Sequence, residues 1–211
     1  MDKVTLFFLF FPAFLFSLSF HECAHAWTAN RLGDSTARLL GRMTLNPIPH
    51  IDLLGTILLP MLTFMAPTGL IPIGGWAKPV PVNYARLQGG RKGVLLVALA
   101  GPASNILLAV VFALLLRGLL LAGINVTGAD ALFGIFEIGV FINLGLAFFN
   151  LIPIHPLDGG KVLEGILPYR WLPVFDQVNR YGMWILIASF YLGLLRIIWI
   201  PVRLAGALLL P

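Results

Sequence analysis

The sequence predicts an all-α, multi-pass membrane protein with about five to six transmembrane or re-entrant helices. Its composition is the first observation: 59% of the 211 residues are hydrophobic and only 11% are charged, whereas soluble domains carry about 25% charged residues. The second observation is that the apolar residues gather in long runs, which a window of about 19 residues resolves into five segments. The length suits a single domain over residues 1–211 and leaves no room for an appended soluble module.

The five apolar segments differ in what they predict. The first is long enough to cross a bilayer and has no small-residue cleavage site, so we do not expect a removable signal peptide. The second is short and holds Pro60, which favours a re-entrant or shallow helix over a tilted crossing. The fourth breaks at Pro153 and Pro156 and then resumes, and the fifth is expected to break at Pro201. In chain order the segments cover about 4–30, 51–66, 93–122, 131–151 with a continuation at 158–167, and 182–210.

Basic residues in the connecting loops predict the orientation. Lys and Arg recur in the loops at 31–50 and 67–92 and are missing from the loop at 123–130, and positive loops favour the cytoplasm. The first helix then runs inward, the third outward and the fourth inward. The polar residues of all three would lie toward the cytoplasmic side of a cell inner or plasma membrane. Because the net charge of +5 is spread over such loops, we expect a lipid bilayer and no nucleic acid as a partner.

The run His21-Glu22-Cys23-Ala24-His25, near the end of the first segment, carries the strongest functional signal. On a helix, two histidines four residues apart share one face and can bind one zinc ion. Glu22, between them, can take a proton from a water at that zinc. Three ionisable side chains in lipid are costly unless they serve a function. The motif therefore predicts an intramembrane metalloprotease, and the alternative is a helix whose polar groups satisfy one another.

Two histidines do not complete a catalytic zinc site, which usually has three protein ligands. Asp158 is the candidate for the third, because a carboxylate in apolar surroundings is best explained by a cation. The prolines before it break the helix and let the chain unwind beside a polar cavity. The alternative role of Asp158 is the N-cap of the next helix. Asn150, before the break, can hydrogen-bond freed backbone groups or an incoming peptide.

Other features have less specific interpretations. With three ligands assigned, His155 is expected not to bind the metal. Cys23 is expected to be a packing residue, because it points away from the histidine face. His50 could cap the second segment or hydrogen-bond near the site. The Val-, Gly- and Pro-rich stretch at 71–83 predicts a small extended or hairpin element. Its edge could pair with an extended substrate, or the stretch could be a structural loop on the membrane surface.

Several runs of the sequence match one known family in the same order. They are His21-Glu-Cys-Ala-His25, Leu45-Asn-Pro-Ile-Pro-His-Ile-Asp52, Gly75-Trp-Ala-Lys-Pro-Val-Pro-Val82, Gly101-Pro-Ala-Ser-Asn105 and the run from Asn150 to Gly160. In these runs the chain resembles the site-2 protease family, peptidase family M50, in the compact form without a PDZ or CBS module. The resemblance covers roughly residues 15–167.

The resemblance implies an activity and a set of roles. The expected activity is hydrolysis of a peptide bond in or near a transmembrane segment of a membrane-protein substrate, as in regulated intramembrane proteolysis. The two histidines of the first motif and Asp158 would bind one zinc ion per chain, and Glu22 would be the general base. Asn105 and Asn150 match polar positions that hold the substrate or the oxyanion. For Asn105 the alternative is close helix packing around it.

Two other functions compete with proteolysis. A membrane metal transporter would need a second acidic or histidine cluster along a path, and the sequence offers one compact ligand set. A metal-binding scaffold without protease activity would have no use for Glu22. Both are therefore less consistent with the sequence than a zinc protease.

Overall fold

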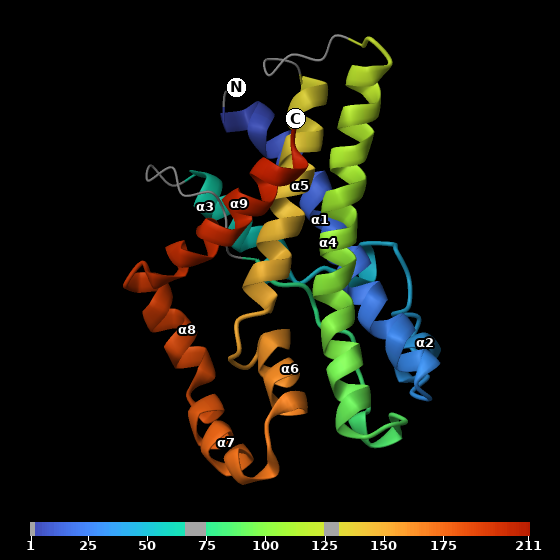
Figure 1. Ribbon diagram of the computed structural model, residues 1–211, viewed down its shortest axis with the longest axis vertical. Coiled ribbons are helices and arrows are strands. Elements are labelled where there is room, and N and C mark those ends of the chain that lie inside the picture. The colour runs from blue at the N-terminus through green and yellow to red at the C-terminus, as the bar shows by residue number, and fades with distance from the viewer. Residues whose placement is uncertain (1–2, 66–74, 125–130) are drawn as a thin grey trace.

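The computed structural model describes residues 3–65, 75–124 and 131–211, and all regular secondary structure in these ranges is helical (Figure 1). This confirms the all-α prediction. Three helices are long and apolar enough to cross a membrane, at Thr5–Arg31, Arg91–Leu121 and Leu132–Asn150. The α-helices are α1 (Lys3–Arg31), α2 (Thr36–Leu39), α3 (Leu59–Met65), α4 (Arg91–Leu121), α5 (Ala131–Asn150), α6 (Asp158–Ile166), α7 (Leu172–Arg180), α8 (Gly182–Tyr191) and α9 (Trp199–Leu209).

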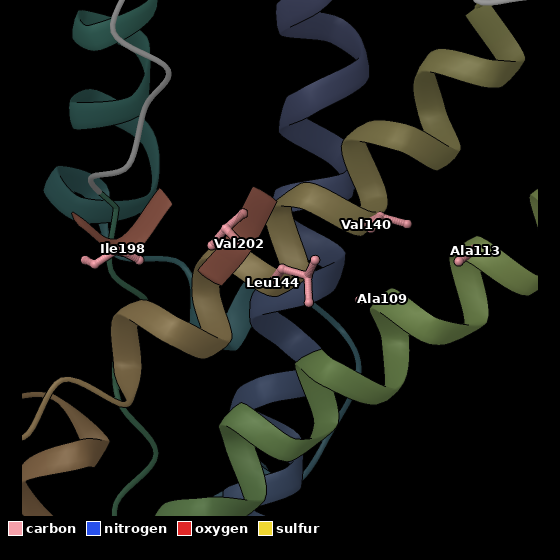
Figure 2. Packing of buried hydrophobic residues seen from close by; sticks show 6 residues of the cluster. All are labelled: Ala109, Ala113, Val140, Leu144, Ile198 and Val202. Atoms are coloured by element: carbon pink, nitrogen blue, oxygen red, sulfur yellow. The ribbon is translucent and has the colours of Figure 1, made fainter. Parts of the chain in front are cut away.

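The three long helices form the centre of the molecule. α4 packs against α1 and α5, which also contact each other, and the chain direction alternates from α1 to α4 to α5 (Figure 1). Ala109 and Ala113 on α4 let α5 approach closely, because small residues bring membrane helices together. They join Val140 and Leu144 of α5 and Val202 of α9 in one buried cluster (Figure 2). The first, third and fourth apolar segments are thus helices that pack on one another.

The second apolar segment is short in the structure as well. A π-helical stretch at Leu53–Leu58 leads into α3, and Asp52 begins it by accepting hydrogen bonds from two backbone N–H groups. At about 1.5 Å per residue these helical stretches extend at most about 20 Å, well short of the ~30 Å hydrocarbon core. Pro60 lies in the first turn of α3 and does not interrupt it, since a first-turn residue needs no intrahelical N–H bond.

The predicted break after the fourth segment is present. α5 ends at Asn150, and after a proline-containing loop α6 begins at Asp158. α6 is fastened to the start of α4, because the Arg91 guanidinium donates to the backbone carbonyls of Glu164 and Leu167. The start of α6 therefore has a fixed position beside the long helices.

The C-terminal apolar segment is bent. α8 and the stretch Leu194–Leu209, which contains α9, meet at 87°. The bend lies at Gly193, whose φ of 71° is in the left-handed region that favours glycine, and not at Pro201 as expected. Pro201 lies in the first turn of α9, where proline is tolerated. The described residues thus contain three candidate spans, or four with the bent pair. The expected number of five to six transmembrane or re-entrant helices is reached only if the short and bent helices are counted as well.

Asp34 fastens the end of α1 to the chain that precedes α4. Its side chain is fully buried and accepts hydrogen bonds from the N–H and hydroxyl of Thr36 and from the N–H of Asn83. Burial by itself raises the pKa of this carboxyl, but these hydrogen bonds and the charge of Arg86 together hold the pKa of Asp34 below its ordinary value. The ionised form is therefore the one that the fold stabilises.

Candidate metal centre

Three side chains from two distant parts of the chain meet where α1 faces α6. His21 and His25 are one turn apart on the same face of α1, and their Nε2 atoms are 3.0 Å from each other. Asp158, the first residue of α6, places Oδ2 3.1 Å from His21 Nε2 and 3.3 Å from His25 Nε2. Leu157 takes the N-cap position of α6, so the Asp158 carboxylate is directed at the histidines instead of capping the helix.

Hydrogen bonds on the far side of each imidazole determine which nitrogen faces the centre. His25 Nδ1 donates to the Val97 carbonyl at 2.7 Å, and His21 Nδ1 donates to Asn105 Oδ1 at 2.6 Å. In a neutral imidazole the other nitrogen, Nε2, then carries only a lone pair. With both rings neutral, two lone pairs and a carboxylate oxygen therefore converge. This arrangement is repulsive unless a cation lies among them.

The spacing of the three ligand atoms suits zinc. Zinc bonds to histidine nitrogen and carboxylate oxygen are about 2.0–2.2 Å long, which places two ligands of a tetrahedral ion about 3.3 Å apart. The observed separations of 3.0, 3.1 and 3.3 Å match one face of such a tetrahedron. In the described part of the chain, this is the one group of three or more His, Cys, Asp or Glu side chains close enough to share an ion. The donor set therefore fits a zinc ion.

Glu22 lies next to the centre and is held by the backbone of another segment. Its side chain is mostly buried, and its Oε2 accepts a hydrogen bond from the Val80 N–H at 2.9 Å. Glu22, the two histidines and Asp158 all line one cavity. A carboxylate held beside a set of metal ligands is placed to exchange a proton with a molecule bound there.

A buried amide network supports His21 from behind. The Asn105 side chain, which is fully buried on α4, donates to Asn143 Oδ1 on α5 and to the Ser17 carbonyl on α1. Asn143 in turn donates to Ser17 Oγ and to the Gly139 carbonyl. Asn105 does not line the cavity, so the role that this geometry supports is orientation of His21. Asn143 was not among the residues predicted from the sequence, although an amide in the middle of an apolar segment was a signal that could have found it.

The remaining polar candidates lie around the centre in different ways. Asn150 lines the cavity at the end of α5, where its Nδ2 donates to the Leu146 carbonyl and keeps a second hydrogen. His155 lies outside the ligand triangle, with Nε2 3.7 Å from Glu164 Oε2. His50 donates from Nε2 to the Thr44 carbonyl and is buried. Asn150 is therefore the polar candidate, beyond the triangle and Glu22, that an occupant of the cavity would meet.

The cavity beside the centre is large and mainly apolar. Its volume is about 1620 Å³, and much of its wall comes from α1, the stretch at 75–82, α5, α8, the bent region before α9 and the first turns of α9. Side chains such as Phe10, Phe14 and Phe141 make up much of this wall. Pockets for small molecules measure about 300–1,000 Å³, so the space is large enough for a longer apolar occupant.

The stretch at 75–83 forms one side of the cavity as an extended chain without strand pairing in the structure. The N–H groups of alternate residues point inward and are satisfied there: Trp76 donates to the Gly55 carbonyl, Lys78 to the His50 carbonyl and Val80 to Glu22. The opposite edge carries Ala77, Pro79 and Pro81, and proline has no N–H. Ala77 is therefore the one N–H donor on that edge between 76 and 82. Residues 71–74 of the expected element lie outside the described residues.

Comparison with known proteins gives a consistent picture. The family model described as Peptidase family M50 matches residues 119–193. "Putative zinc metalloprotease YwhC" of Bacillus subtilis is 37% identical over 195 residues, which cover 90% of this chain and 83% of that protein. "Putative zinc metalloprotease Rip2" of Mycolicibacterium smegmatis is 36% identical over 190 residues, covering 89% of this chain and 68% of that protein. No solved structure gave a significant match.

Proposed function

This chain belongs to the site-2 protease family, peptidase family M50, a family of zinc metalloproteases, and we propose that it hydrolyses a peptide bond in or near a transmembrane segment of a membrane-protein substrate. The observation that carries the proposal is the triangle of His21, His25 and Asp158 beside Glu22 in the wall of an apolar cavity. A carrier or store of metal ions would need the triangle but not the adjacent carboxylate.

The chain's own residues supply the proton transfers of hydrolysis. A zinc ion held by the triangle would act as a Lewis acid toward the scissile carbonyl and the attacking water. Glu22 takes a proton from that water and later delivers it to the leaving amine nitrogen. The Val80 N–H occupies Oε2 of Glu22, so Oε1 is the oxygen through which the proton moves. The Nδ1 hydrogen bonds of His21 and His25 keep both rings turned toward the centre.

A transmembrane substrate must unwind before it can react, because a helix keeps its carbonyls hydrogen-bonded. The apolar cavity wall suits the side chains of such a segment. The second hydrogen on Asn150 Nδ2 is available to the substrate or the oxyanion. Ala77 and Pro79 line the cavity, and their backbone carbonyls are acceptors for an unwound strand. The Pro79 carbonyl keeps one lone pair for this, because it already accepts a hydrogen bond from Arg42 at 3.3 Å. This edge of the 75–83 stretch would thus accept hydrogen bonds from the substrate backbone through its carbonyls, and the Ala77 N–H would be the donor on it.

The proposal includes a location. The basic loops at 31–50 and 67–92 support an orientation with the metal centre toward the cytoplasmic side of an inner or plasma membrane. A site at that depth would release a fragment of its substrate to the cytoplasm, which is the purpose of regulated intramembrane proteolysis. The partners are therefore membrane-protein substrates and the bilayer itself.

The test is cleavage by matched glutamate variants. Substrates are first identified by comparing membrane-protein fragments in cells that carry the wild type or Glu22→Gln. The purified proteins are then reconstituted in vesicles with one such substrate. Glu22→Gln should keep its zinc and lose at least ~10²–10⁴-fold in rate. Glu164→Gln, the same change outside the cavity, should cleave normally. Near-normal cleavage by Glu22→Gln, or equal loss in both variants, would overturn the proposal.

A further inference from the structure

α7 presents three different faces around its axis. Successive residues of a helix are about 100° apart. Phe175 and Asn179, one turn apart, face the protein: Phe175 is 8% exposed and its ring lies 6.2 Å from that of His155. Asn179 Oδ1 accepts a hydrogen bond from the His155 N–H. These contacts fix the rotation of α7, so the other two faces cannot turn inward.

The second face is apolar and uncovered. We call it the α7 apolar face and define it as Trp171, Val174, Val178 and Tyr181, which follow one another at spacings of three or four residues. Their exposures are 51%, 52%, 47% and 60%. The third face carries Asp176, Gln177 and Arg180, which are all exposed. A helix in water next to a protein needs only two faces, one apolar and one polar. The extra apolar face therefore calls for an apolar neighbour.

We propose that α7 lies in the interface of the bilayer, with the α7 apolar face in the boundary between headgroups and acyl chains. The chain continues directly from α7 into α8, where Trp184 is 70% exposed, and α8 belongs to the bent pair of candidate membrane helices. Tryptophan and tyrosine at the two ends of the α7 apolar face are the residues enriched at this depth.

The charges and the position of α7 agree with this occupant. Arg170 and Arg180 lie near the two ends of the helix and are exposed. Arginine side chains of this kind extend toward lipid phosphates while their stems cover apolar surface. Figure 1 shows α7 near the end of the molecule where α4 begins, that is, at the end of a candidate membrane span. A helix with one face on the protein, one in lipid and one in water fits that position.

Spin labels on the two open faces test the proposal. The native Cys23, the sole cysteine, is replaced by alanine. Single cysteines are then introduced at Val174 and Val178 on the α7 apolar face and at Gln177 and Arg180 on the polar face. The full chain is reconstituted in phosphatidylcholine–phosphatidylglycerol vesicles. Collisions of each label with oxygen, which enriches in lipid, and with a water-soluble nickel chelate report its depth.

The labels at positions 174 and 178 should lie about 5–10 Å below the phosphates and collide mainly with oxygen, whereas those at 177 and 180 should collide mainly with the nickel chelate. Equal access of the chelate to all four would place the face in water and overturn the proposal. Shielding of 174 and 178 from both reagents would mean that protein covers the face, which also overturns it. Trp171→Phe gives a second readout without a label, because it should remove part of the tryptophan quenching by lipids brominated near the headgroup.

Discussion

Replacing Gly101 by alanine should strongly weaken zinc binding at the metal centre while leaving the helices folded. At Gly101 the backbone of α4 lies directly against the two histidines of α1. A Cβ at this position would lie 2.3 Å from His25 Nε2 and 2.6 Å from His21 Nε2. Those two atoms are the ones that must face the metal, so the added methyl group would occupy the space into which their lone pairs point.

The expected loss of zinc affinity follows from the distances between the added Cβ and the two Nε2 atoms. Ordinary contact with a Cβ begins at 3.4 Å, so the His25 ring would have to retreat by about 1 Å. The Nδ1 bonds to Val97 and Asn105 oppose this movement. Metal–ligand distances tolerate about 0.2 Å, and a misplacement of about 1 Å costs a catalytic group about 10²-fold. The affinity for zinc should therefore fall at least ~10²-fold, or about 2.7 kcal/mol.

The assay is zinc competition against a chelator of known affinity, with circular dichroism as the check on folding. Gly118→Ala is the matched control, because it lies on the same helix and a Cβ there meets nothing within 4 Å. The control should keep its zinc and be as stable as the wild type or more so, since alanine favours helix over glycine by about 1 kcal/mol. A folded Gly101→Ala protein with wild-type zinc affinity would refute the reasoning.

Asp158→Asn should lose much of the zinc, because a neutral oxygen is a weaker ligand, whereas His155→Ala should retain it; metal analysis compares the two. Substrates with Gly, Pro or Asn near the scissile bond should be cleaved faster than versions with Leu, because these residues lower the cost of opening a helix, and equal rates in bilayers would rule out unwinding. Ala77→Pro should slow helical substrates more than short unstructured peptides, whereas Val80→Pro should slow both, because it removes the N–H that holds the catalytic base. The carboxylate of Asp34 has a lowered pKa in the fold. Its stabilising effect is therefore complete above its ordinary pKa of 3.8 and is lost as pH falls from there through the lowered pKa; Asp34→Asn should flatten this acid limb in thermal unfolding curves.

Local patterns in the sequence determined much of the architecture. Long apolar runs identified the helices that pack as α1, α4 and α5, because the length needed to cross a bilayer is a property of the segment itself. Pro153 and Pro156 predicted the break that precedes Asp158. Pro201 did not bend the fifth segment as predicted, because proline is tolerated in the first turn of a helix and α9 begins just before it. The bend lies instead at Gly193, which has a left-handed backbone conformation.

The sequence also named the groups that the structure brings together. The spacing of His21 and His25 places them on one helical face by geometry alone, and a carboxylate at 158 has few other reasons to be in apolar surroundings. Residue type and spacing are enough for such inferences, because the cost of an ionisable group in lipid does not depend on the details of the fold.

Only the tertiary structure determined the hydrogen bonds that hold the side chains of the site in place. Val80 reaches Glu22 across 58 positions of the chain, and Asn105 reaches His21 across 84. No local signal predicts such pairs. They depend on how closely α4 approaches α1 at Gly101 and on how the 75–83 stretch crosses α1. Helix packing determines these distances, and a hydrogen bond forms only within a few tenths of an ångström of its ordinary length. The ligand types could therefore be read from the sequence, whereas their orientation could be found only in the packed molecule.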